Sequence, residues 1–331
     1  MKQGEKLMKH AGNLPTATAK EKQASAFAPA TVANVVCGFD VFGFAVENPG
    51  DVVHVRWTEA PGVVVSKIVG DEGRLPLDAN KNTAGVAVIQ FLEKAGIKQG
   101  IEIELHKNLP LGSGMGSSAS SAVAALVAIN SLAGSLYSKR ELVPFALEAE
   151  RVACGSAHAD NIAPSLLGGF VLIRSYHPLD IVSIPFPDYL CCVLVHPNIE
   201  LKTKDARQLL KPTLPLRDAV QQWGNTAGMV AGLMKSDDEL IARSMTDLVA
   251  EPARAMLIPG YDAVKIAAKE AGAIGCGISG SGPTMFALCN KTSTAERAGH
   301  AMIEAFKIAG LDSEMFVSKL NNEGAVVIGG R

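Results

Sequence analysis

Two different periods of apolar residues along this chain predict its strands and helices. Residues 101–105 (IEIEL) alternate apolar and acidic side chains, the pattern of a strand with one buried face. Residues 122–132 are small and apolar, and they predict a helix that Gly134 can end. A helical apolar pattern over residues 83–95 stops at Gly96. A strand and a helix therefore flank a polar segment that begins after residue 105.

The remaining apolar runs predict a chain that mixes strands with helices. Helices are expected at residues 142–152 and 295–309. The expected strands are, in order, 51–58 and 62–69 of an antiparallel sheet, then 170–174, 189–195, 285–289 and 325–328. We expect the last helix and the last strand to complete a βαβ-like C-terminal unit.

Composition and chain breaks predict a tail and two domains. Residues 1–25 are rich in Lys, Ala, Thr and Gln without a periodic apolar face, so we expect a mobile tail there. Prolines at 185 and 187 mark a break between an N-terminal domain, residues 26–185, and a C-terminal domain, residues 186–331. At 331 residues, 48% hydrophobic and 5% aromatic, the chain must build its core from Val, Ile, Leu and Ala.

Charge and cysteine usage exclude several classes of protein. The formal net charge is −2 and no block of basic residues occurs, which argues against a nucleic-acid surface. The six cysteines have no zinc-site spacing and no C-x-x-C motif, and several lie in apolar runs where buried, reduced thiols are expected. No apolar run approaches the roughly 18 residues of a membrane span, and the N-terminus lacks the apolar core of a signal peptide. We therefore expect a cytoplasmic protein.

Glycines and serines fill the segment between the strand at 101–105 and the helix that follows. Gly112, Gly114 and Gly116 let the backbone approach a ligand closely, and the helix offers free N–H groups and the positive end of its dipole. A phosphate group fits both features, and the nearby serine hydroxyls can donate to its oxygens or ligate Mg²⁺. The alternative is a loop that only turns the chain and caps the helix. The Walker pattern is absent and the spacing does not fit GxGxxG, which argues against an ordinary P-loop and a dinucleotide-dependent oxidoreductase.

Residues 110–119 (PLGSGMGSSA) resemble the phosphate loop of the GHMP kinases, P-x-G-x-G-L-G-S-S-A. The one departure is a methionine in place of leucine, which conserves side-chain volume. The resemblance implies that this loop holds the triphosphate of ATP and that an upstream asparagine lies near the adenine. The implied ATP-binding residues are Asn82, Pro110, Leu111, Gly112, Ser113, Gly114, Met115, Gly116, Ser117 and Ser118.

Residues 29–43 (PATVANVVCGFDVFG) are expected to form a loop that crosses between strands and carries Asn34 and Asp40. An aspartate is the simplest partner for a substrate ammonium group. Alternatively, both residues only make side-chain-to-backbone turns. The stretch is similar to the first GHMP motif, P-A-[ST]-x-A-N-x-G-x-G-F-D, although Val36 and Cys37 fill its middle positions and one family glycine is missing. The resemblance implies that Asn34 and Asp40 line an acceptor pocket.

Two acidic residues, Glu150 and Asp160, lie close to or within the segment 158–164 (HADNIAP). One carboxylate could hold Mg²⁺ while the other orients or deprotonates a hydroxyl. Alternatively, Glu150 is a solvated helix residue and the segment is a polar turn. The segment is similar to H-x-D-N-x-A-P of GHMP kinases that act on an amino acid, with Cys154 in place of the usual serine nearby. This resemblance implies that His158 binds the acceptor.

Two arginines and a second glycine-rich loop complete the pattern. A single arginine among apolar residues is commonly a surface ion pair, whereas a forked guanidinium suits a substrate carboxylate. Arg207, which follows Thr203, and Arg254 stand as in GHMP kinases with an amino-acid acceptor, which implies a clamp on the carboxylate. Residues 272–284 contain GISGSGPT, which matches the third GHMP motif and implies that Gly280 supports the phosphate loop and the substrate.

Over residues 26–330 these motifs occur in the order found in GHMP kinases that phosphorylate L-homoserine. The resemblance implies an α+β fold, with a ribosomal protein S5 domain 2-like N-terminal domain, a ferredoxin-like C-terminal domain and an active site between them. It also implies transfer of the ATP γ-phosphate to L-homoserine for threonine biosynthesis, in a homodimer, with Mg²⁺ at Ser118 and Glu150 and Asp160 as the candidate base. The implied substrate-binding residues are Asn34, Asp40, His158, Thr203, Arg207, Arg254 and Gly280.

Two alternatives within this fold stay open. Another GHMP kinase, acting on mevalonate or a sugar, would share the phosphate loop, but an aspartate and an arginine pair in the acceptor pocket disfavour it. A ligand sensor without catalysis should lose the Mg²⁺ and acceptor residues, yet Ser118, Glu150 and Asp160 are all present.

Overall fold

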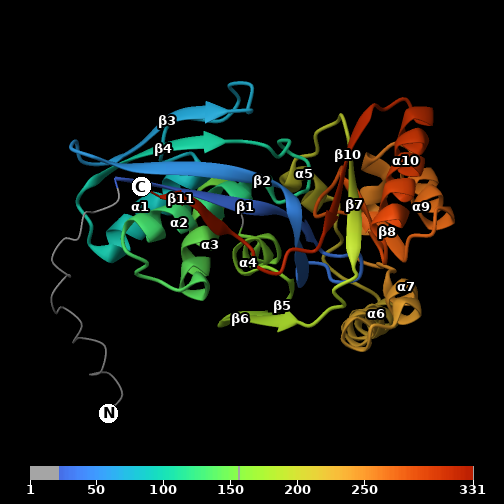
Figure 1. The fold of residues 1–331 in the computed structure, drawn as a ribbon. Helices are drawn as coiled ribbons and strands as arrows, with labels where there is room; N and C mark the ends of the chain where they lie inside the picture. Colours follow the sequence, from blue (N-terminus) through green and yellow to red (C-terminus); the bar gives the residue numbers. More distant parts are fainter. Residues whose placement is uncertain (1–21, 156, 331) are drawn as a thin grey trace, which may run out of the picture.

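Two β-sheets, each covered by helices, make up the described part of the chain (Figure 1). The computed structural model describes residues 22–155 and 157–330. The larger sheet comes mainly from the first half of the chain and the smaller sheet from the second half (Figure 1). The expected tail falls largely on residues 1–21, which lie outside the described residues, and the first strand begins at Gln23.

The larger sheet has the strand order β11–β1–β2–β4–β3, and β5 joins it by pairing with β2 and β6. The central pairs β1–β2 and β2–β4 are antiparallel. In β4, Ile101, Ile103 and Leu105 are buried and the acidic residues between them are partly exposed, so the predicted alternation is confirmed. The strands are β1 (Gln23–Ala33), β2 (Phe42–Thr58), β3 (Val63–Val69), β4 (Gly100–His106), β5 (Phe170–Tyr176), β6 (Leu179–Ile184) and β11 (Val326–Gly330).

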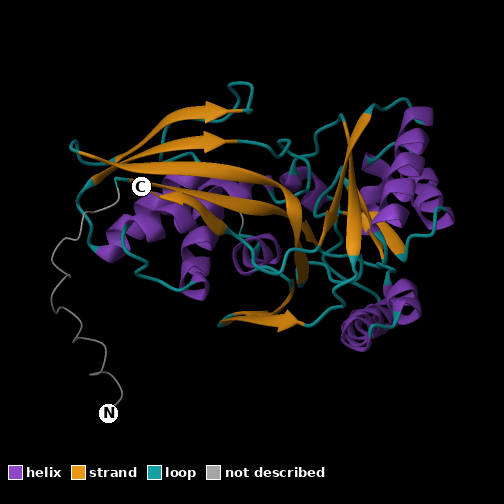
Figure 2. Ribbon diagram, viewed as in Figure 1, coloured by secondary structure: helices purple, strands orange, loops and turns teal. Residues whose placement is uncertain are grey.

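Helices α1 to α4 lie on one side of this sheet (Figure 2). Helix α2 contacts β1 and β2, and its small Ala and Val side chains are buried along most of its length. It begins at Ser117, earlier than predicted, because the serines that end the glycine-rich loop form its first turn. Helix α1 ends at Gly96, with a φ of 68°, as predicted. The helices are α1 (Thr83–Ala95), α2 (Ser117–Leu132), α3 (Lys139–Cys154) and α4 (Ala159–Leu167).

The smaller sheet has the order β10–β7–β9–β8, and its neighbouring strands are antiparallel. If these four strands are numbered 1 to 4 along the chain, their order in the sheet is 4-1-3-2, the strand order of a ferredoxin-like sheet. Helices α9 and α10 pack against these strands (Figure 1). The elements are β7 (Cys191–Pro197), α5 (Thr203–Gln208), α6 (Leu216–Lys235), α7 (Asp238–Ser244), α8 (Glu251–Arg254), η1 (Ala255–Leu257), α9 (Tyr261–Glu270), β8 (Gly275–Ile278), β9 (Met285–Cys289), α10 (Thr292–Ile308) and β10 (Ser313–Lys319).

Two strand assignments differ from the sequence prediction. The pairing of β3 with β4 is parallel and not antiparallel, because helix α1 forms a crossover between them. The last strand, β11, was expected to complete the C-terminal unit, and that expectation is wrong: β11 pairs with β1 at the edge of the larger sheet. An apolar period predicts that a segment is a strand but not which free edge it covers. The domain boundary near residue 185 stays a prediction.

The cysteines and the helices fit two further observations. Within the described chain, five cysteines are buried and free, as expected for reduced thiols, whereas the side chain of Cys154 is not described. None of the helices in residues 22–155 and 157–330 combines the length and the apolar character needed to cross a membrane. The five buried thiols are Cys37, Cys191, Cys192, Cys276 and Cys289.

Candidate active site

Glycines shape the turn between β4 and α2. Gly112, Gly114 and Gly116 have left-handed φ values of 63°, 79° and 69°. A Cβ atom at Gly114 would lie 2.4 Å from the carbonyl oxygen of Ser279, and one at Gly116 would lie 2.1 Å from Oγ1 of Thr31, so a side chain fits at neither position. Gly116 is the N-cap of α2, and as a glycine it provides no side-chain cap of its own. The N-terminal end of α2 is therefore available to an anion.

A cavity of about 150 Å³ joins this turn to the segments expected to bind an acceptor. Its walls come from the loop before β2, the first turn of α2, the helices α3, α4, α5 and α8, and the second glycine-rich loop. Motifs that lie far apart in the sequence thus meet at one place. The predicted site residues that line the cavity are Asn34, Asp40, Gly112, Ser113, Gly114, Gly116, Ser117, Ser118, Glu150, His158, Asp160, Thr203, Arg207, Arg254 and Gly280.

The other predicted ATP-binding residues lie outside this cavity. Pro110 and Leu111 line a second cavity of about 360 Å³. Met115 is fully buried in the core beneath the loop. Asn82 is the N-cap of α1 and accepts hydrogen bonds from two backbone N–H groups of that helix with its side-chain oxygen. Asn82 does not line the cavity, and its link to the adenine stays a prediction.

The acceptor side of the cavity carries an ion pair and two arginines on one aromatic ring. Asp40 and Arg207 form a two-pronged pair, with Nη1–Oδ2 at 3.0 Å and Nη2–Oδ1 at 2.7 Å. The guanidinium groups of Arg207 and Arg254 lie 5.5 and 5.3 Å from the centre of the Phe39 ring. Burial lowers the pKa of His158, whose Nε2 lies 3.4 Å from Nη2 of Arg207, and this favours the neutral imidazole.

Asn34 connects the acceptor loop to the second glycine-rich loop. Its Nδ2 donates to the carbonyl oxygen of Gly280 at 2.8 Å, and its Oδ1 accepts from the N–H of Asp40 at 3.0 Å. Arg254 donates to the same Gly280 oxygen through Nη1 at 2.8 Å. Asn34 and Arg254, both predicted to bind the acceptor, therefore share one hydrogen-bond acceptor on Gly280. These bonds tie the positions of the three residues to one another.

The loop that carries Asn34 is strained and is supported by α6. Asn34, Val35 and Val36 have positive φ values of 68°, 42° and 62°, which β-branched residues rarely adopt. Val36 stands where the family motif has a glycine, so this chain keeps the left-handed conformation without the residue that suits it. From α6, Gln222 Nε2 and Thr226 Oγ1 donate to the Cys37 carbonyl oxygen at 2.8 and 2.9 Å. These bonds hold the loop in its strained shape.

Two buried carboxylates border the cavity from α3 and α4. Glu150 and Asp160 are 6% and 2% exposed, and among the described residues Oε1 of Glu150 and Oδ1 of Asp160 have no hydrogen-bond partner. Burial raises the pKa of Glu150, and a hydrogen bond from Ser118 partly opposes this. Burial, together with the charge of Asp40, raises the pKa of Asp160 to about 7. Asp160 can therefore gain or lose a proton near neutral pH, as a catalytic base must.

The residues present also fit a magnesium ion that is bound together with phosphate. In residues 22–155 and 157–330, the His, Cys, Asp and Glu side chains form no cluster of three or more that could hold a metal by themselves. Mg²⁺ needs fewer protein ligands, because it keeps waters and binds phosphate oxygens. The buried, unpartnered oxygen of Glu150 beside the Ser118 hydroxyl is a ligand set of that kind.

Comparisons with known proteins decide the family. The chain matches the model of the GHMP kinases N terminal domain over residues 82–169 and that of the GHMP kinases C terminal domain over residues 229–308. It is 55% identical over 320 residues to a homoserine kinase of Chlorobium phaeobacteroides, across 93% of this chain and 100% of that one. The crystal structure of homoserine kinase from Cytophaga hutchinsonii matches with a TM-score of 0.92 and 54% identity, across 96% of this chain and 100% of that one.

This chain belongs to the homoserine kinases. The two-domain GHMP fold that the motifs implied is thereby confirmed. The crystal structure of a mevalonate kinase from L. major matches with a TM-score of 0.69 at 14% identity, across 93% of this chain and 99% of that one, and it shares the fold alone.

Several residues in or near this cavity were missed by the sequence prediction. For two of them a signal was present. Lys107 continues the row of inward-facing positions of β4 beyond Leu105, and Asp51 continues the buried row of β2 before Val53. A charged residue in a buried row of a strand needs a partner, and each of these two provides one for the other. The residues missed are Phe39, Asp51, Lys107, Asn161 and Ser281.

Proposed function

We propose that this protein transfers the γ-phosphoryl group of ATP to the side-chain hydroxyl of L-homoserine, which gives O-phospho-L-homoserine and ADP for threonine biosynthesis. The observation that carries the proposal is the cavity in which a loop suited to phosphate meets both acidic and arginine side chains. A kinase takes its phosphoryl group from ATP, and the loop suits the triphosphate. An amino-acid alcohol brings an ammonium, a carboxylate and a hydroxyl, and the other wall has groups that suit each.

The triphosphate binds along the backbone of residues 112–118, where the N-terminal end of α2 favours negative charge. Ser118 and Glu150 hold Mg²⁺, and the unpartnered buried oxygen of Glu150 supports that role. Bound there with the phosphates, Mg²⁺ supplies positive charge that offsets the charge on the transferred group. The adenine end of the nucleotide lies near Asn82 in this proposal.

The acceptor binds through its two charged groups. Asp40 receives the ammonium, and Arg207 and Arg254 receive the carboxylate. A zwitterionic amino acid carries both an ammonium and a carboxylate group. When it binds, Asp40 can exchange Arg207 for the ammonium and Arg207 can exchange Asp40 for the carboxylate, so each side chain keeps an oppositely charged partner. The Nε of Arg254 is buried and has no partner in the described part of the chain, which leaves a donor for the carboxylate. The full set is Asn34, Asp40, His158, Thr203, Arg207, Arg254 and Gly280.

In the chemical step, the proton of the acceptor hydroxyl passes to the carboxylate of Asp160. The hydroxyl oxygen forms a bond to the γ-phosphorus, the bond from that phosphorus to the bridging oxygen breaks, and ADP leaves. The pKa of about 7 leaves Asp160 partly ionised at neutral pH, and its unpartnered oxygen supports the role of base. Positioning and charge neutralisation by the loop and Glu150 contribute the rest of the rate acceleration.

A coupled assay of ADP release tests this function with ATP and a panel of L-homoserine, mevalonate and galactose as acceptors. The proposal predicts that kcat/KM for L-homoserine exceeds that for the other acceptors by about 100-fold or more, and that phosphorus NMR detects a phosphate monoester of homoserine. A preference for mevalonate or galactose would favour a sibling kinase. Absence of turnover with every acceptor would favour a ligand sensor.

The proposal also includes two expectations from the family: the protein forms a homodimer, and it acts in the cytoplasm. Size-exclusion chromatography with light scattering measures the mass directly. A mass near twice the 34.6 kDa of the chain agrees with a dimer, and a mass near 34.6 kDa contradicts it. Fractionation of cells followed by immunodetection tests the cytoplasmic location.

A further inference from the structure

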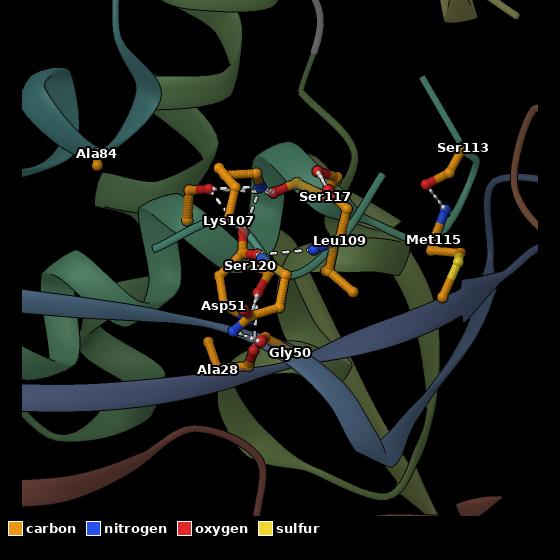
Figure 3. A network of polar contacts seen from close by, with 12 residues as sticks. Ala28, Gly50, Asp51, Ala84, Lys107, Leu109, Ser113, Met115, Ser117 and Ser120 are labelled. Carbon is orange, nitrogen blue, oxygen red and sulfur yellow. Dashed lines mark hydrogen bonds and ion pairs between the residues drawn. The ribbon is translucent and has the colours of Figure 1, made fainter. Parts of the chain in front are cut away.

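A buried ion pair lies beneath the phosphate loop, between the sheet and α2 (Figure 3). Lys107 directly follows β4, and Asp51 belongs to the neighbouring strand β2. Their side chains are 1% and 0% exposed, and neither residue lines the cavity that holds the predicted site. The pair therefore touches neither the nucleotide nor the acceptor of the proposed reaction, and any effect on them passes through the loop.

Asp51 holds the first end of the loop. Its Oδ1 accepts hydrogen bonds from the backbone N–H groups of Asn108 and Leu109, at 3.0 and 3.2 Å. These residues follow Lys107 and start the path from β4 to the three glycines. A carboxylate that binds consecutive N–H groups fixes the direction in which the chain leaves the strand.

Lys107 holds the other end of the loop. Its Nζ donates to the carbonyl oxygen of Ser117 at 2.8 Å and to Oγ of Ser121 at 2.9 Å, and it pairs with Oδ2 of Asp51. Ser117 is the first residue of α2, so the ammonium is fixed to the first turn of the helix (Figure 3). Ser121 closes the ring, because its Oγ lies 2.8 Å from Oδ2 of Asp51.

Every proton of the Lys107 ammonium has an acceptor, and the hydrogen bonds of the ion pair reach both ends of the loop. The lysine ammonium has three protons and finds three acceptors: a carboxylate, a carbonyl and a hydroxyl. Apolar residues of similar size would stabilise a core at least as well as a buried ion pair does. A pair kept only for stability would not need bonds to both ends of one loop, whereas a fully satisfied polar network suits the task of fixing geometry.

We propose that Lys107 and Asp51 are positioning residues, which fix the separation of the two ends of the phosphate loop and thereby set the affinity for ATP. This inference rests on the proposed function, because it takes the loop to be the triphosphate site. The acceptor residues belong to other segments, so the binding of homoserine depends little on the pair. Loss of the pair should weaken nucleotide binding and leave the KM for homoserine nearly unchanged.

The double variant Asp51→Asn/Lys107→Met tests this proposal. It removes both charges together, so no unpaired charge stays buried, and the asparagine oxygen can still accept from the two N–H groups. Calorimetry with an Mg²⁺ complex of a non-hydrolysable ATP analogue gives the dissociation constant. We expect it to rise about tenfold, the effect of one charged hydrogen bond, while the KM for homoserine changes less than about twofold. A dissociation constant within about twofold of wild type in the folded double variant would overturn the proposal.

Two milder variants keep the test decisive if the double variant does not fold. Ser121→Ala removes only the hydroxyl that bridges the pair, and we expect it to weaken analogue binding about threefold. Ser165→Ala is its matched control: Ser165 is also buried, but it donates to the carbonyl oxygen of Pro29 in β1, at 3.0 Å, and not to a residue of the loop or to the ion pair. Equal binding by both serine variants would contradict the proposal.

A stability control separates positioning from general destabilisation. Phe306→Leu weakens the core of the C-terminal half, and at an equal loss of Tm it should leave analogue binding unchanged. An equal loss of binding in Phe306→Leu would mean that the pair acts through stability alone. The binding experiment uses neither acceptor nor turnover, so it stays informative even if the wild-type protein fails to phosphorylate homoserine.

Discussion

Asp40 and Arg207 lie 167 positions apart in the sequence, and they bind each other through two parallel hydrogen bonds at the cavity. In the proposed complex each takes a new partner on the amino acid. Arg207→Lys keeps the charge but loses the fork that matches a carboxylate. We expect the KM for homoserine to rise about tenfold and the KM for ATP to stay unchanged in steady-state kinetics. Arg151→Lys, on an exposed pair of α3, is the control, and equal KM values in both variants would contradict this role.

Arg254 should matter for the acceptor for two reasons. It holds the Gly280 carbonyl oxygen, and its buried Nε has no partner among the residues described. Arg254→Ala should raise the KM for homoserine by about tenfold to 100-fold, because it removes charged hydrogen bonds, while the KM for ATP changes little. Arg297→Ala, on the exposed side of α10, is the matched control. An unchanged KM for homoserine in Arg254→Ala would remove this arginine from the carboxylate site.

Asp160→Asn should lower kcat and raise the free energy of unfolding. The pKa of Asp160 is about 7 in the folded chain against an ordinary 3.8, so between these values the folded state binds more protons than the unfolded state. Wild-type stability therefore falls as the pH rises through this window, and asparagine removes the dependence. We expect kcat to fall about 100-fold or more. We expect the advantage of the variant in free energy of unfolding to grow from pH 4 to pH 8, by at most about 4 kcal/mol.

Urea unfolding of both proteins at several pH values measures this difference. Asp188→Asn, in an exposed turn, is the control for the amide substitution itself. If the advantage of Asp160→Asn were the same at pH 4 and pH 8, the buried aspartate would not have the proposed protonation. Near-normal turnover in that variant would show that Asp160 is not the base.

Gln222 should act on the acceptor from outside the cavity. It is buried, and it donates both to the Cys37 carbonyl oxygen, at 2.8 Å, and to Oδ1 of Asp247, at 2.9 Å. Gln222→Ala should relax the strained loop that carries Asn34, so the KM for homoserine should rise about fivefold while ATP affinity stays the same. The neighbouring Gln221 is exposed, and Gln221→Ala is the matched control. Parallel kinetics of the two variants decide the matter, and identical KM values would rule out support by Gln222.

The sequence predicted the features that depend on neighbouring residues. The alternation at 101–105 predicted the buried face of β4, and the pattern at 83–95 predicted α1 with its end at Gly96, because a period reports which side of an element is buried. The glycine-rich turn was equally accessible, since its strand, its glycines and its helix follow one another directly. These local signals were enough to predict the elements and the phosphate loop, whereas the class of fold was implied by the resemblance to the GHMP kinases.

The sequence did not predict which distant segments meet. The motifs gave residue types for the acceptor pocket, but not that Asp40 and Arg207 would pair with each other. Nothing in the apolar period indicated that β11 would cover β1, because pairing depends on the free edges of the finished sheet. The pairing of Lys107 with Asp51 depends in the same way on the register of β2 against β4. The catalytic and binding roles stay predictions.

A crystal structure with a non-hydrolysable ATP analogue, Mg²⁺ and L-homoserine tests the central claim most directly. The account predicts that the triphosphate lies on the backbone of residues 112–118 at the start of α2, with the acceptor hydroxyl about 3 Å from the carboxylate of Asp160. A triphosphate bound away from that turn, or a hydroxyl outside the reach of Asp160, would contradict the account.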